Sequence, residues 1–194
     1  MAALRRFAKA GYYAIAQDLY QRQGDATKVS DFKALVTNII GRTPNTAVMT
    51  NLDSTLAFVR HDGGNTTRNG ITGLCWGGRI VWLCAAHHPM LKAGVAWYGR
   101  LTGTGTPLQP NKPIDLVASI SAPVSDLYGG LDKGIAVTDV DRMNGALNAT
   151  GKPSSLPVFS RANHGFLADY RPSYNEAAAN ERWTKALAWF ERYL

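Results

Sequence analysis

Cysteine is scarce in this sequence, and long apolar runs are absent. Only Cys75 and Cys84 occur among 194 residues. Because neither fits a CxxC or Cys/His ligand pattern, the sequence predicts no disulfide framework and no zinc or other metal site. No segment resembles a signal peptide, and no apolar run approaches the ~18 residues that span a bilayer. We therefore expect a cytoplasmic protein with no membrane partner, in surroundings that keep a thiol reduced.

Clustered positive charge is also lacking, although the net charge is +7. The basic residues are scattered, and Arg5-Arg6 is their only adjacent pair. Nucleic-acid-binding domains concentrate Lys and Arg on one face or helix. The sequence therefore predicts no nucleic-acid partner, but a basic surface that attracts anionic small molecules.

The remaining composition predicts an ordinary globular domain. Apolar residues make up 45% and charged residues 18% of the chain, and 194 residues suit a single domain over residues 1–194. Strand-like and helical segments alternate, which favours an α/β fold with a mostly parallel sheet covered on both faces. We expect residues 100–120 to form a long segment on the surface. The expected strands are 12–20, 70–74, 92–99, 122–129 and 156–160, and the expected helices are 2–10, 30–40 with Ser30 as N-cap, one from near Pro44, 76–88, 137–149 and 173–194.

The stretch Gly73-Leu-Cys75-Trp-Gly77 places a thiol between glycines, at the end of a predicted strand and the start of a predicted helix. This pattern is the thiol form of the nucleophile elbow, in which residues two before and two after the nucleophile are packed too closely for a side chain. The helix N-terminus favours a thiolate, and the N–H of Trp76 would face the oxyanion of a tetrahedral intermediate. A buried structural cysteine is the alternative, and it is our expectation for Cys84.

A nucleophilic thiol needs a base and an orienting carboxylate, in the chain order nucleophile, acid, histidine. Asp132 and His164 each follow a predicted strand in that order, and reactive groups gather at the carboxyl ends of parallel strands. His164 would accept the thiol proton while Asp132 fixes the imidazole. An ordinary loop histidine and an Asp-Lys-Gly turn are the alternatives, with Asp126 or Asp139 as other candidates for the acid.

Four segments, GLCWGGR, GVAWYGRL, LYGGLDKGI and HGFLADYRPSY, together resemble the dienelactone hydrolase (carboxymethylenebutenolidase) family. The resemblance extends from RRFAKAGYYAIAQDLYQRQGD to the last predicted helix. It implies an α/β-hydrolase-like three-layer sandwich and hydrolysis of a small lactone or ester without a cofactor. On this resemblance Cys75 is the nucleophile, His164 the base and Asp132 its partner.

The resemblance also implies a substrate that carries a carboxylate held by arginine. Arg171, on the segment that follows His164, is the first candidate, because a guanidinium binds a carboxylate through two parallel bonds. Arg22 is a second candidate, and Tyr98 is a candidate for lining the pocket. Surface exposure for the arginines, and simple packing for the tyrosine, remain open alternatives.

The chain departs from the family pattern at its start, and two of its predicted strands have unusual residues. Members of the family open with further strands and a glutamate-containing segment that supplies a second oxyanion N–H. We therefore expect a sheet without its amino-terminal strands, and losing one oxyanion donor typically costs ~10²–10³ in rate. A truncated, catalytically impaired relative that binds ligands or has no activity remains the alternative. Polar Ser125-Asp126 also interrupts a predicted strand, and Pro157 within another suits only an edge. No oligomeric state is predicted.

Overall fold

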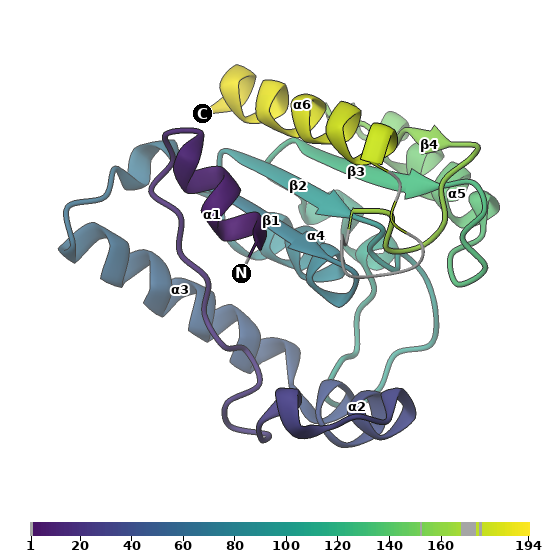
Figure 1. Cartoon of the computed structure of the whole chain (residues 1–194), viewed down its shortest axis with the longest axis horizontal. Coiled ribbons are helices and arrows are strands. Elements are labelled where there is room, and N and C mark those ends of the chain that lie inside the picture. The colour runs from purple at the N-terminus through teal and green to yellow at the C-terminus, as the bar shows by residue number, and fades with distance from the viewer. Residues whose placement is uncertain (1, 152, 168–173, 175) are drawn as a thin grey trace. The chain divides into compact units, whose positions relative to one another are not determined.

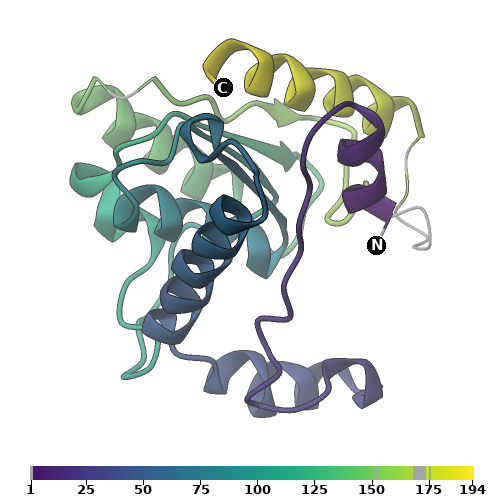
Figure 2. The same ribbon diagram turned by 90° about the vertical axis from the view of Figure 1, so that its left-hand side faces the viewer.

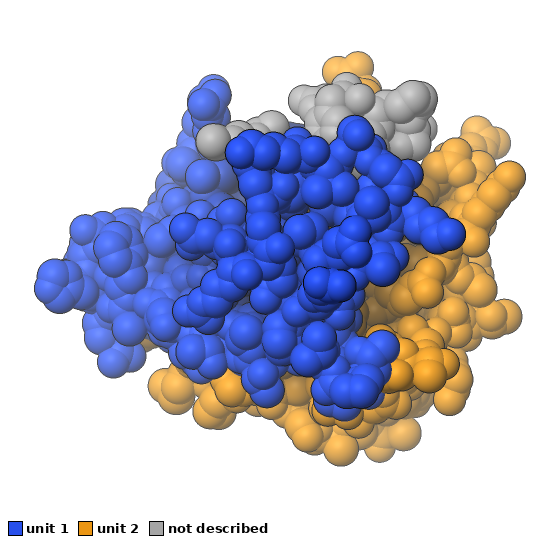
Figure 3. All heavy atoms as spheres, turned by 90° about the horizontal axis from the view of Figure 1, so that it is seen from below, with its two compact units in different colours: residues 1–66, 106–110 blue, residues 67–105, 111–194 orange. Residues whose placement is uncertain are grey.

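The computed structural model describes residues 2–151, 153–167, 174 and 176–194. The chain forms two compact units, shown in blue and orange in Figure 3. Unit 1 comprises residues 1–66 and 106–110, and unit 2 comprises residues 67–105 and 111–194. None of the helices in the described ranges has both the length and the apolar character needed to cross a bilayer.

A parallel sheet forms the centre of unit 2. Its four described strands lie in the order β1-β2-β3-β4, and every pair is parallel. Parallel neighbours require crossover connections, and here the helices provide them. The strands are β1 (Gly70–Leu74), β2 (Ala93–Trp97), β3 (Val124–Gly129) and β4 (Val158–Phe159), and the helices are α4 (Trp76–His87), α5 (Val137–Ala149) and α6 (Glu176–Tyr193).

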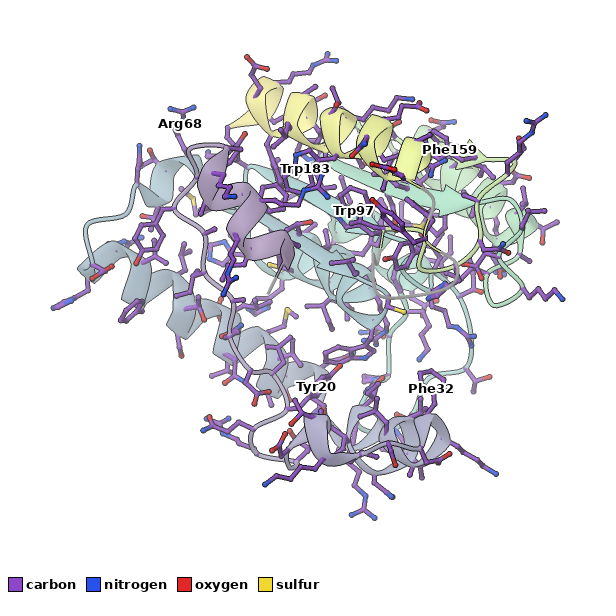
Figure 4. The ribbon with its side chains drawn as sticks, viewed as in Figure 1. Tyr20, Phe32, Arg68, Trp97, Phe159 and Trp183 are labelled. Atoms are coloured by element: carbon purple, nitrogen blue, oxygen red, sulfur yellow. The ribbon has the colours of Figure 1, made fainter. Side chains whose placement is uncertain are left out.

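Helices cover both faces of this sheet, as predicted. A Cβ on Gly94 of β2 would lie 2.7 Å from Val81 of α4, and one on Gly70 of β1 would lie 2.8 Å from Phe190 of α6. Gly94 pairs in register with Ile71, so Gly94 and Gly70 face opposite ways. Figures 1 and 2 show α6 along one face of the strands. Figure 4 shows Trp97 of β2 and Trp183 of α6 between the sheet and that helix.

Strand β4 is short and lies at one edge of the described sheet. The preceding Pro157 lacks an N–H, but its carbonyl accepts the N–H of Tyr128 at 3.1 Å. Pro157, expected within this strand, therefore directly precedes it, next to the edge of the described sheet. The helix expected from Ser173 is described from Glu176, and residues 173 and 175 lie outside the described residues.

The segment between β2 and β3 is a surface segment only in part: residues 103–108 are exposed as predicted, but its two ends are partly buried. Leu101, Val117 and Ile120 are buried, and Pro113–Ser119 forms the 3₁₀ helix η4, which packs against α4. Residues 106–110 belong to unit 1. Proline frequency predicted exposure, but Leu101 before the prolines and Val117 and Ile120 after them supply buried apolar surface, which is worth about 25 cal/mol per Å².

Unit 1 is helical. It contains α1 (Ala2–Lys9), α2 (Phe32–Asn38) and α3 (Asn45–His61), with the short 3₁₀ turns η1 (Ala26–Lys28) and η2 (Ile40–Arg42). A third turn, η3 (Thr66–Arg68), spans the boundary between the units. Asp31, rather than the predicted Ser30, caps α2 and accepts the N–H of Ala34 at 2.6 Å. A carboxylate at this position also interacts favourably with the helix dipole.

The predicted strand at 12–20 is wrong. No strand among the described residues pairs with this segment, which instead runs along α3 through side-chain bonds from Tyr13 to Asp62 and between Gln17 and Thr55. Tyr13 and Ile15 are 53% and 44% exposed. Apolar residues alone do not make a strand, because each backbone N–H and C=O of a strand needs a partner on a neighbour.

Candidate active site

Cys75 lies at the bend where β1 ends and α4 begins. Its backbone has φ 58° and ψ −117°, a region that non-glycine residues rarely occupy and that costs about 1–3 kcal/mol. The Cys75 N–H donates to Trp97 O at 2.9 Å, which anchors the bend to β2. The side chain is half-buried. The predicted sharp strand-to-helix turn is therefore present, and it places the thiol at the carboxyl end of the sheet.

Close backbone contact explains two of the glycines around this bend, but not the third. A Cβ on Gly73 would lie 2.3 Å from Gly77 O, and one on Gly78 would lie 2.9 Å from the Gly99 backbone. A Cβ on Gly77 would meet nothing within 4 Å. The prediction that Gly77 has no room for a side chain is therefore wrong. Gly78 is the crowded position, because the first turn of α4 touches the chain leaving β2 at Gly99.

The structure brings the three predicted side chains together. Cys75 Sγ lies 2.7 Å from His164 Nε2, and His164 Nδ1 lies 2.7 Å from Asp132 Oδ2. The other carboxylate oxygen, Asp132 Oδ1, accepts the N–H of Gly134 at 2.8 Å. The Asp132 side chain is 1% exposed and that of His164 is 33% exposed. A buried carboxylate with both oxygens bonded holds the imidazole in one orientation.

Backbone contacts place the Asp132 turn beside the His164 loop. Leu131 N–H donates to Ala162 O at 2.9 Å, and Gly130 N–H donates to Phe159 O at 2.8 Å. A Cβ on Gly129 would lie 2.3 Å from Ala162 O. The glycine pair at the end of β3 therefore lets the two loops approach, although their catalytic candidates are separated by 32 residues.

The surroundings of His164 favour its charged form. The hydrogen bond with Cys75 raises the pKa of His164 to about 9, together with the charge of Cys75 and the bond and charge of Asp132, whereas burial lowers it. The imidazole is therefore protonated at neutral pH. A protonated imidazole beside the sulfur stabilises a thiolate, which is the nucleophilic form.

This raised pKa predicts that stability depends on pH. A histidine whose pKa is higher in the folded than in the unfolded chain stabilises below its unfolded value of 6.5, and the contribution is lost as pH rises through about 9. Over this window we expect the free energy of unfolding of wild type to fall by about 1–2 kcal/mol relative to that of His164→Asn. This is less than the whole pKa difference would give, because water screens the partly exposed imidazole. Urea unfolding at pH 6 to 10 (roughly the titration range of the pair) measures it, and parallel curves for the two proteins would contradict it.

Tyr98 and Trp76 belong to the same unit as the three side chains. Tyr98 has φ 43° and is 3% exposed. Its ring packs on His164, with centroids 4.8 Å apart, and on Phe166 at 5.3 Å. These are packing contacts, so a role in substrate binding stays a prediction. Trp76 is the first residue of α4, where N–H groups are not bonded within the helix, and its oxyanion role also stays a prediction.

Neither of the two predicted arginines is among the described residues of unit 2. Arg171 lies outside the described residues. Arg22 is exposed in unit 1, in the turn after residues 12–20. Both remain predictions as substrate-binding residues.

The alternative carboxylates are placed elsewhere in unit 2. Asp126 is fully buried under α4, where Trp82 Nε1 donates to its Oδ2 at 2.7 Å, and Asp139 lies in the first turn of α5. Cys84 is buried within α4, as predicted. The N–H of Gly134 was missed, although Asp-x-Gly is a common signal for a turn closed by the aspartate side chain. Within the described ranges, no three His, Cys, Asp or Glu side chains gather as a metal site.

Comparisons with known proteins identify the family of the chain. The family model described as "Dienelactone hydrolase family" matches residues 2–194. A "Putative carboxymethylenebutenolidase" of Methylorubrum extorquens is 48% identical over 190 residues, which are 97% of this chain and 65% of that protein. A protein of the same name from Escherichia coli O157:H7 is 44% identical, over 97% of this chain and 70% of its own length. The chain thus spans about two thirds of these relatives.

A solved structure shows the same fold. The crystal structure of a "Putative Dienelactone Hydrolase" from Klebsiella pneumoniae superposes with a TM-score of 0.95 at 43% identity, covering 97% of this chain and 79% of that one. An acylaminoacyl peptidase of Pyrococcus horikoshii shares the fold with a TM-score of 0.62 at 18% identity. The predicted α/β-hydrolase-like fold is confirmed, and the chain belongs to the dienelactone hydrolase family.

Proposed function

We propose that the chain hydrolyses a small lactone or carboxylic ester through a thioester on Cys75. The observation that carries this proposal is the continuous relay from Cys75 Sγ to His164 and from His164 to Asp132, with 2.7 Å at each step. The sulfur lies at a strained bend before a helix N-terminus rather than in the core. The family membership supports the choice of an ester bond as the one cleaved.

The chemistry follows from the positions of three groups. The Cys75 thiolate attacks the carbonyl carbon, and the carbonyl oxygen takes up negative charge near the N–H of Trp76. The tetrahedral intermediate collapses, the C–O bond breaks, and the imidazolium of His164 protonates the leaving alkoxide. His164, now neutral, removes a proton from water, whose oxygen attacks the thioester. The second tetrahedral intermediate collapses with cleavage of the C–S bond, so that the acid is released and Cys75 is again a thiolate beside the imidazolium of His164.

Asp132 has a fixed role in this cycle. Because its Oδ1 is held by the N–H of Gly134 and its Oδ2 by His164 Nδ1, it keeps Nε2 directed at the sulfur throughout. It also stabilises the positive charge on the imidazole without accepting the proton.

An anionic substrate suits the charge of the chain. The net charge of +7 raises the local concentration of small carboxylates. Arg171 and Arg22 are the proposed carboxylate-binding residues, and Tyr98 the proposed aromatic contact, on the family resemblance. A lactone ring bearing a carboxylate is therefore the proposed substrate class.

Trapping of the acyl group tests this proposal. An activated ester such as p-nitrophenyl acetate is mixed with the protein and quenched in acid after seconds, and the peptides are analysed by mass spectrometry. We expect one acetyl group on the peptide containing Cys75, none on Cys84, and loss of the adduct over time as water hydrolyses it. An unmodified Cys75 with intact fold would contradict the proposal and favour the catalytically impaired alternative.

A further inference from the structure

A fully buried aspartate lies beneath α4, the helix that follows Cys75. Asp126 of β3 is 0% exposed. Its Oδ2 accepts the indole N–H of Trp82 from α4 at 2.7 Å and also lies in hydrogen-bond contact with the hydroxyl of Tyr128. Asp126 has no part in the proposed hydrolysis, and a carboxylate at an inward position of a central strand is costly unless it is bonded or neutral.

The hydroxyl of Tyr128 has two oxygen neighbours and a single proton. One neighbour is Asp126 Oδ2, and the other is Gly99 O at 2.9 Å. If Asp126 is ionised, only one of these contacts can be a hydrogen bond. If Asp126 is protonated on Oδ2, it donates to the Tyr128 oxygen, and Tyr128 donates to Gly99. The remaining lone pair of Oδ2 still accepts from Trp82, so each of these three contacts has its own hydrogen. The other oxygen of Asp126, Oδ1, is buried and has no hydrogen-bond partner among the described residues, which is costly for a charged carboxylate.

Gly99 connects this chain of bonds to the proposed nucleophile and base. The Gly99 backbone touches the first turn of α4, since a Cβ on Gly99 would lie 2.5 Å from the carbonyl carbon of Gly78. The preceding residue, Tyr98, packs on the ring of His164. A shift of Gly99 would therefore move both the start of the Cys75 helix and the surface that supports His164.

We propose that protonated Asp126 is a positioning residue, which through Tyr128 fixes the Gly99 turn against the helix of Cys75. The inference rests on the proposed function for its catalytic consequence, but the protonation can be observed without catalysis. Loss of the proton would leave one of the Tyr128 contacts without a hydrogen and loosen the turn.

The surroundings of Asp126 favour the neutral form. Burial raises the pKa of Asp126 to about 7, against the lowering effect of Tyr128, Trp82 and the backbone of Gly99 and Leu127. Burial is the largest cause that holds the pKa of Tyr128 well above its usual value. Trp82, the group facing Asp126 from α4, carries no charge. Within the described part of the chain, no Lys or Arg forms an ion pair with Asp126.

Infrared spectroscopy tests the protonation directly. Wild type in deuterated buffer at mildly acidic pH should show a carboxylic acid band from a buried group, which converts to a carboxylate band as pH rises through about 7. Asp126→Asn removes this band and assigns it. An Asp126 that gives only a carboxylate band at mildly acidic pH overturns the proposal.

Stability offers a second readout with a defined sign. A carboxyl group whose pKa is raised in the folded protein stabilises that protein at low pH. This contribution is lost as pH rises from 3.8, the pKa of the group in the unfolded chain, to about 7. The unfolding free energy of wild type should fall over that window relative to Asp126→Asn. This window overlaps that of His164 only between pH 6.5 and about 7, so the two titrations are separable, and parallel profiles overturn the proposal.

The positioning role is tested with Tyr128→Phe, which keeps the ring but removes the hydroxyl. We expect the turnover number for an activated ester to fall roughly tenfold, as for loss of a bonded positioning group, with little change in KM. Ser125→Ala, on the opposite face of the same strand, is the matched control and should be unchanged. Folded Tyr128→Phe protein with wild-type turnover overturns the role. If neither wild type nor the control forms an acyl-enzyme, the proposed function fails, and the infrared band still decides whether Asp126 is protonated.

Discussion

Replacement of Cys75 by alanine is expected to lower the rate of ester cleavage at least about 10³-fold, because groups of a nucleophile–base relay act as a unit. In the proposed mechanism the sulfur forms the covalent bond, and His164 faces it at 2.7 Å. The alanine variant retains the imidazole and the helix N-terminus but has no atom to attack the carbonyl. Release of p-nitrophenol under single-turnover conditions measures the effect.

The second cysteine provides the matched control for this substitution. Cys84 is 5% exposed and lies within α4. Cys84→Ala removes one buried sulfur, so we expect a modest loss of stability, about 1 kcal/mol, and unchanged cleavage. Equal losses of activity in the two variants would indicate a general effect on folding, and wild-type activity in Cys75→Ala would eliminate the sulfur as nucleophile.

Alanine at Gly73 is expected to destabilise the protein by at least about 2–3 kcal/mol, as for overpacking against rigid neighbours. The added methyl group would lie 2.3 Å from Gly77 O, and a backbone carbonyl cannot move away without opening the first turn of α4. Since that turn presents Cys75, activity should fall in the protein that remains folded. Urea unfolding and the rate of ester cleavage measure the two effects.

Gly77→Ala is the control for this packing explanation, because it adds the same methyl group at an uncrowded glycine. A Cβ there meets nothing within 4 Å, and alanine favours a helix by about 0.5–1 kcal/mol over glycine. We therefore expect unchanged or slightly increased stability. If Gly77→Ala proved as harmful as Gly73→Ala, the packing account of the bend would be wrong.

Much of the candidate site could be predicted from the sequence because its signals are local. Glycines around a thiol, at the junction of a β-branched segment and a helical one, predict a strand-to-helix bend, and Cys75 occupies that bend with φ 58°. Asp132 and His164 each follow a strand, and parallel strands bring their carboxyl ends to one edge. The family motifs then distinguished Asp132 from Asp126 and Asp139.

The wrong predictions share a physical cause: each concerns a feature that depends on contacts with residues distant in the chain. Residues 12–20 have the apolar content of a strand, but no described strand pairs with them, and their side chains bond to α3. Gly77 was predicted to be crowded because it lies two residues after the nucleophile, yet the close contact of the following helix turn falls on Gly78, where Gly99 approaches.

The sequence by itself determined the alternation of strands and helices, the bend at Cys75 and the order of the acid and base, since each follows from residues close together in the chain. Only the tertiary structure decided that His164 lies 2.7 Å from the sulfur. It also decided which glycines lie too close to neighbouring backbone to carry a side chain, and how Asp126 is accommodated inside the sheet. Those outcomes depend on contacts between segments far apart in the chain, and local propensities do not encode them.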